Sequence, residues 1–137
     1  MAATKTELLG WTNRLLELKL QDLKQCANGA VYCQILDAYF PHAVPVHKVN
    51  FHAKETHEVL GNYKCLQAAL SAVEVTRDIH VQRLSQGTPA DLLELLQWLN
   101  KFLHRKVQVD GYNPTARRAL SARGATDDVP VPSACTA

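Results

Sequence analysis

One segment of the chain is apolar on nearly every face that a helix would have, and this limits the possible folds. It begins with Thr88, a good N-cap residue, and Pro89, which suits the first position of a helix. Its apolar residues are Leu92, Leu93, Leu95, Leu96, Trp98, Leu99, Phe102 and Leu103. A helix with so little polar surface has to be covered by other elements. The segment therefore predicts a helical bundle with this helix near its middle.

Three further helices are predicted from apolar periodicity. Thr4 and Glu7 have the spacing of a capping box, and an apolar stripe follows at Leu8, Trp11, Leu15 and Leu18. A second helix covers residues 31–40 and ends at Pro41. A longer one runs from about residue 53 to 73, with apolar residues at Val59, Tyr63, Leu66, Leu70 and Val73.

The remaining segments of the body predict short turns and loops. Residues 22–26 and 81–84 are expected to form single helical turns, and residues 41–51 an ordered loop or isolated turns. No segment has the pattern of a strand with a partner. The expected fold class is all-α, with four main helices and short connecting helices.

Composition excludes several classes of protein. The 137 residues fit one domain and a tail, and 47% apolar with 20% charged residues is typical of a globular chain. A net charge of +2 does not suggest a nucleic-acid partner, and no apolar run approaches the roughly 18 residues of a membrane span. The four cysteines have neither CxxC nor zinc spacing, which favours a reducing, cytoplasmic environment.

The carboxyl-terminal part differs from the rest. From Val109 onward the chain is rich in Gly, Pro, Ser, Thr, Ala and Arg and poor in large apolar residues. Such a segment has little to offset the entropy lost on ordering. We therefore predict a domain over residues 1–107 and a flexible, partly basic linker over 108–137, which suggests that another module follows.

The sequence contains no recognisable catalytic or cofactor motif. Phosphate-binding glycine loops, dinucleotide fingerprints and nucleophile elbows are absent. Histidines recur every five residues from position 42 to 57, whereas helical metal ligands are spaced three or four apart. We expect no enzyme activity, no metal and no cofactor; an enzyme would need a hidden pocket lined by His57, Cys65 or Glu94.

Basic residues are the more informative polar feature. Lys48 lies in the loop, and Lys54 and Lys64 are separated by nearly three turns, so they share a face if the helix is continuous. Arg77 follows the end of that helix. These residues form either an ordinary solvated face or a surface that speeds the encounter with an acidic partner.

Several motifs stand out along the body of the chain: besides Trp11, they are Gly29-Ala30-x-Tyr32-Cys33-Gln34-x-x-Asp37-x-x-Phe40-Pro41, Lys48-Val49-x-Phe51-x-Ala53-Lys54-x-x-His57-Glu58, Asn62-Tyr63-Lys64-x-Leu66-Gln67 and Gln97-Trp98 with Lys101-Phe102. Together they resemble the amino-terminal calponin-homology domain of the microtubule end-binding proteins. The resemblance runs from about residue 7 to 103. It implies a calponin-homology domain that docks on tubulin at growing microtubule ends and performs no nucleotide chemistry itself.

The resemblance also implies a site and an assembly state. It assigns tubulin contacts to His47, Lys48, Lys54, Lys64, Arg77 and Glu94. His47 stands where the family usually has a lysine, so its contact is expected to be stronger once the imidazole is protonated. Gln86, Thr88 and Ala90 also depart from the family pattern. The family's coiled coil is missing, so this chain is expected to be a monomer, located on cytoplasmic microtubules. Actin-binding and adaptor-type calponin-homology domains are the alternative interpretations.

Overall fold

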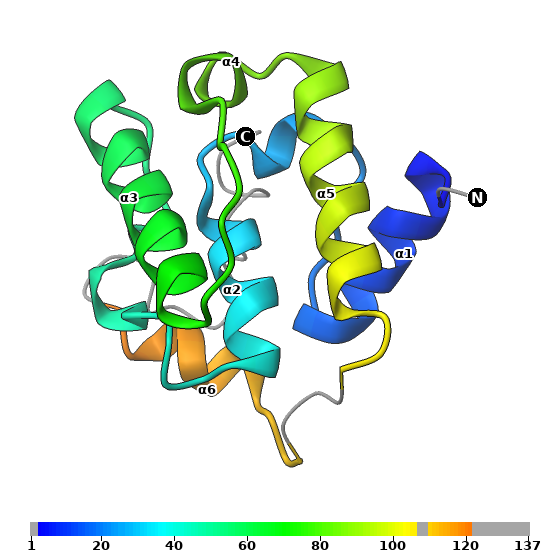
Figure 1. Cartoon of the computed structure of the whole chain (residues 1–137), viewed down its shortest axis with the longest axis vertical. Coiled ribbons are helices and arrows are strands. Elements are labelled where there is room, and N and C mark those ends of the chain that lie inside the picture. The colour runs from blue at the N-terminus through cyan, green and yellow to red at the C-terminus, as the bar shows by residue number, and fades with distance from the viewer. Residues whose placement is uncertain (1–2, 107–109, 122–137) are drawn as a thin grey trace.

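The computed structural model describes residues 3–106 and 110–121, and in this part of the chain every regular element is a helix (Figure 1). The predicted all-α class with four main helices, α1, α2, α3 and α5, is confirmed. None of the described helices is both long and apolar enough to span a membrane. The elements in order are α1 (Lys5–Leu16), η1 (Leu23–Cys26), α2 (Ala30–Tyr39), η2 (Val46–Lys48), α3 (Thr56–Ala72), α4 (Val81–Ser85), α5 (Pro89–Leu103) and α6 (Pro114–Ala119).

The ends of the helices follow local sequence signals. The Thr4 side chain accepts a hydrogen bond from the Glu7 N–H at 3.2 Å, and the Glu7 carboxylate accepts one from the Thr4 N–H at 2.9 Å, which is the predicted capping box. Thr88 is the N-cap of α5 and Pro89 its first residue, also as predicted. The Thr88 side chain makes no capping hydrogen bond, however, so the proline and the extended Thr88 backbone define this end.

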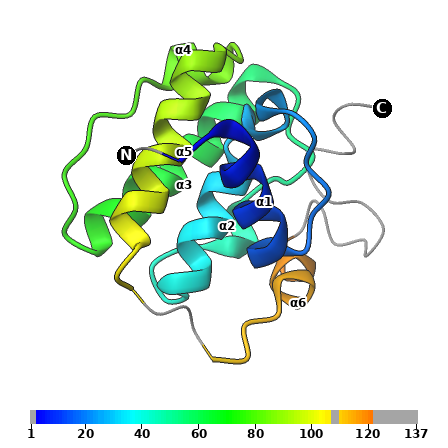
Figure 2. The same ribbon diagram turned by 90° about the vertical axis from the view of Figure 1, so that its right-hand side faces the viewer.

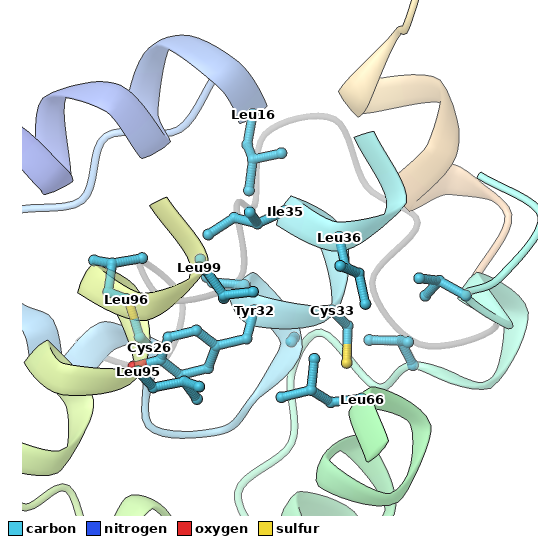
Figure 3. Close-up of a cluster of buried hydrophobic side chains, with 14 of the residues drawn as sticks. Leu16, Cys26, Tyr32, Cys33, Ile35, Leu36, Leu66, Leu95, Leu96 and Leu99 are labelled. Atoms are coloured by element: carbon cyan, nitrogen blue, oxygen red, sulfur yellow. The ribbon is translucent and has the colours of Figure 1, made fainter. Parts of the chain in front are cut away.

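The most enclosed helix is α2, and the prediction that α5 would occupy the middle of the bundle is only partly right. All residues from Ala30 to Ala38 are buried, and α2 contacts α1, α3 and α5 (Figure 1 and Figure 2). Figure 3 shows Tyr32, Cys33, Ile35 and Leu36 of α2 in one cluster with Leu66 of α3 and Leu95, Leu96 and Leu99 of α5. On α5 the other leucines are buried, whereas Leu93, Trp98 and Phe102 remain partly exposed.

The start of α3 differs from its predicted position. The helix begins at Thr56, not near residue 53, because Glu55 acts as its N-cap. The Glu58 carboxylate accepts hydrogen bonds from the N–H groups of Lys54 (3.2 Å) and Glu55 (3.1 Å). Lys54 therefore precedes the helix, and the argument from helical spacing does not apply to Lys54 and Lys64.

The predicted linker is wrong for residues 110–121. These residues include α6, which packs against α1 below α2 in Figure 1. Its order comes from polar contacts with distant residues: the Arg117 guanidinium donates to both oxygens of the fully buried Asp37, at 2.9 and 2.8 Å. Composition alone could not reveal this partner. The other residues of the predicted linker, 108–109 and 122–137, lie outside the described part.

Candidate functional site

The loop between α2 and α3 carries three of the predicted site residues, and its backbone is fastened to α3 by Asn62. The Asn62 side chain accepts from the Asn50 N–H at 2.8 Å and donates to the carbonyls of Asn50 (2.9 Å) and Asn28 (2.8 Å). Asn62 is only 1% exposed, and a buried amide bonded in this way fixes the groups around it. The loop is therefore fixed to α3 at Asn50.

A glycine makes room for this arrangement. Gly29 precedes α2 with a φ of 86°, a conformation that side chains disfavour. A Cβ at this position would lie 3.2 Å from the Tyr63 ring and 3.3 Å from the Asn62 Cβ. The absence of a side chain thus lets α3 approach closely, with the Tyr63 hydroxyl donating to the Ala27 carbonyl at 2.8 Å.

Burial alternates along the loop and leaves its basic residues exposed. Its buried residues are Val44, Val46, Val49, Phe51 and Ala53. His47, Lys48 and Lys54 lie between or beside these anchors and are exposed. The apolar contacts thereby hold the backbone while the basic side chains extend into solvent.

The charge of Lys48 acts on a residue of α3. Burial raises the pKa of the Cys65 thiol, whereas the positive charge of Lys48 lowers it. Lys64, the neighbour of Cys65 on α3, is exposed. We call His47, Lys48, Lys54 and Lys64 the basic surface. Within the described part of the chain, no ion pair neutralises any of these four residues.

Arg77 and Glu94 belong to a different environment. Arg77 lies in the connector between α3 and α4, which passes between α3 and α5 in Figure 1, and its guanidinium contacts the Glu94 carboxylate of α5 at 3.2 Å. The same guanidinium lies 4.8 Å from the centroid of the Trp98 ring. The structure therefore brings Arg77 and Glu94 together as a pair. Among the described residues, no hydrogen bond or ion pair connects this pair to the basic surface.

Sequence reasoning missed an open groove beside this pair. It has a volume of about 1630 Å³ and lies between the start of α1, the connector and α5. Trp98 and Phe102 stack at 5.1 Å along it, and Lys106 lies 5.7 Å from the Phe102 ring. The leucines around Trp98 predict that this side chain is covered, as the apolar pattern of the whole segment does. Only its partial exposure at the edge of α5 shows that it lines a surface.

The described residues offer no obvious reactive centre. Within 3–106 and 110–121, no three His, Cys, Asp or Glu side chains converge as a metal site requires. Burial raises the pKa of Cys26 to about 12 and also raises that of Cys33, so both thiols stay protonated. The Cys33 thiol donates to the Asn62 carbonyl at 3.3 Å, which is a structural role.

The chain is similar to proteins of one family. Residues 2–95 match the calponin homology (CH) domain. The chain is 42% identical over 122 residues to the microtubule-associated protein RP/EB family member 1B of Arabidopsis thaliana, covering 87% of this chain and 42% of that protein. Family member 1C of the same plant is 42% identical over 124 residues, covering 88% of this chain and 37% of that protein. The chain thus spans about two fifths of the length of these relatives.

A solved structure extends the likeness to three dimensions. The structure described as "Structural Basis of Microtubule Plus End Tracking by XMAP215, CLIP-170 and EB1" superposes with a TM-score of 0.79 at 38% identity. The match covers 85% of this chain and 99% of the other. The helical fold, the family match and the sequence identity to these relatives all indicate the same family. The chain therefore belongs to the calponin homology family, within its branch of microtubule end-binding proteins.

Proposed function

We propose that the chain is a microtubule-binding module that docks its basic surface on acidic tubulin and recognises growing microtubule ends. The observation that carries this proposal is the state of the charges. His47, Lys48, Lys54 and Lys64 are exposed and have no ion pair in the described part of the chain. Lysines without an ion pair, on a fixed backbone, can meet an acidic partner without first breaking internal contacts.

Arg77 and Glu94 take a secondary part in the proposal. Their mutual contact lowers the charge that either presents, and the Arg77 side chain is only 25% exposed. We expect the pair to exchange partners at the edge of the tubulin contact. The affinity should then depend less on Arg77 than on Lys48.

No bond is made or broken in the proposed activity, and no cofactor is needed. The chain would act as a monomer on cytoplasmic microtubules, at their plus ends and on the spindle. An actin-binding or adaptor function is the alternative, but the relatives and the solved structure above are named for microtubules.

Co-sedimentation with microtubules and with actin filaments, at low and moderate salt, tests the proposal. We expect pelleting with microtubules only, weakening as salt rises because the contact is electrostatic. Lys48→Glu and Lys54→Glu should abolish pelleting while thermal unfolding is unchanged. Lys19→Glu is the matched control, because Lys19 is exposed, unpaired in the described part and outside the basic surface. Equal pelleting by the wild type and the three variants would show that the basic surface does not contact tubulin.

A further inference from the structure

The segment from Tyr112 to Ser121 is firmly docked although it follows the residues that match the CH domain. Asp37 of α2 is fully buried and accepts three hydrogen bonds from the segment, two from Arg117 and one from the Tyr112 hydroxyl at 2.7 Å. Arg118, 5% exposed, donates to the Leu16 carbonyl at 2.7 Å at the end of α1. The segment is therefore tied to both α1 and α2.

From this docked position, two side chains reach the loop that carries His47 and Lys48. Arg117 donates to the Pro41 carbonyl at 3.3 Å, and the Ser121 hydroxyl donates to the Val49 carbonyl at 2.5 Å. Ser121 is only 2% exposed, so water does not replace it easily as the donor. The loop is thus held before and after His47 and Lys48.

Buried Val44, Val46 and Val49 hold the loop by packing, but its regular structure is slight, so the hydrogen bonds from Arg117 and Ser121 add to its order. Its only helical element, η2, consists of three residues, Val46–Lys48. Asn62 fixes the loop at Asn50, but residues 41–49 precede that point. A loop that samples several paths must be ordered when its charges bind, and this ordering reduces affinity.

We infer that the α6 segment, residues 112–121, is a positioning element for the basic surface and sets the microtubule affinity through the backbone of residues 41–49. The inference rests on the proposed function. Ser121 touches no tubulin in this account; it acts through Val49 on the adjacent Lys48. The folded, binding-competent unit consequently extends beyond the CH match at least to Ser121.

A double-mutant cycle with the full chain separates positioning from a general structural effect. The variants are Ser121→Ala, Lys48→Gln and the double variant. The control is Ser85→Ala, because the Ser85 hydroxyl also donates to a backbone carbonyl, that of Gln82, but within α4. Microtubule affinity is measured by co-sedimentation, and hydrogen exchange is measured at the amides of residues 46–49.

Ser121→Ala should weaken binding on the order of threefold to tenfold, the value expected from the loss of one buried hydrogen bond. It should have little effect in the Lys48→Gln background, and it should speed exchange of the loop amides. Ser85→Ala should change neither quantity. Unchanged affinity in Ser121→Ala, or an equal loss in both backgrounds, would overturn the positioning role. Failure of the proposed function looks different: the wild-type chain itself would not pellet, and the positioning role would fall with it.

Discussion

Replacing Arg117 by methionine should destabilise the protein because it leaves the Asp37 carboxylate buried with one hydrogen-bond donor where it had three. Arg117 contributes two of these bonds, at 2.9 and 2.8 Å, and Tyr112 contributes the third. A hydrogen bond to a charged group contributes about 1.5–3 kcal/mol, so losing two costs about 3–6 kcal/mol. The Arg117 side chain is 29% exposed, and water that enters its place will partly solvate Asp37. We therefore expect about 3 kcal/mol, at the lower end of the range for broken buried pairs.

Urea denaturation followed by circular dichroism measures this loss, and the midpoint of thermal unfolding should fall by about 12 °C at about 4 °C per kcal/mol. The control is Arg105→Met, because Arg105 is exposed and has no ion pair in the described part of the chain. Its unfolding free energy should change by about 0.5 kcal/mol or less.

A second variant distinguishes a buried charge from lost packing. Asp37→Leu combined with Arg117→Met removes both charges, so the double variant should recover to within about 1 kcal/mol of the wild type. A loss below about 1 kcal/mol in Arg117→Met alone would refute the reasoning, because no buried pair costs so little to break. In that case residues 110–121 would behave as the linker that composition predicts.

Three other perturbations have defined outcomes. His47→Glu should weaken co-sedimentation with microtubules, because it places an anion among the exposed basic residues that face acidic tubulin; unchanged pelleting would exclude His47 from the contact. Lys48→Gln should slow the alkylation of Cys65, because burial raises the pKa of this thiol and the charge of Lys48 lowers it. An unchanged rate, measured by mass spectrometry at pH 8, would show that Lys48 does not act on Cys65. Asn62→Ala should reduce the free energy of unfolding by about 3 kcal/mol, because buried backbone groups of Asn50 and Asn28 lose their partners; a loss below about 1 kcal/mol in urea would contradict the role of Asn62.

Local signals in the sequence predicted the body of the fold but not its last helix. Thr4 with Glu7, and Thr88 with Pro89, define helix ends through atoms only a few residues apart. Asn113 and Pro114 carry the same kind of signal, with the Asn113 side chain accepting from the Ala116 N–H at 3.0 Å. A six-residue helix is not stable by itself, so the decisive interaction is with Asp37, far away in the chain.

In the candidate site, too, local features were predictable from the sequence and contacts between distant residues were not. Exposure of Lys48 and Lys54 follows from their polarity between buried apolar neighbours, and sequence reasoning anticipated it. The pairing of Arg77 with Glu94 depends on where the connector between α3 and α4 lies relative to α5, and no local sequence pattern predicts this. The supporting roles of Asn62 and Ser121 were missed for the same reason: each acts on backbone atoms of a distant loop.

Zero-length carbodiimide cross-linking of the chain to microtubules, read by mass spectrometry, tests the central claim most directly. The reagent joins lysines to carboxylates in direct contact, so it reports which face of the domain meets tubulin. The account predicts cross-links from Lys48, Lys54 and Lys64, and none from Lys19 or Lys24, which are also exposed but lie outside the basic surface. Cross-links from Lys19 and Lys24, with none from the other three, would contradict it.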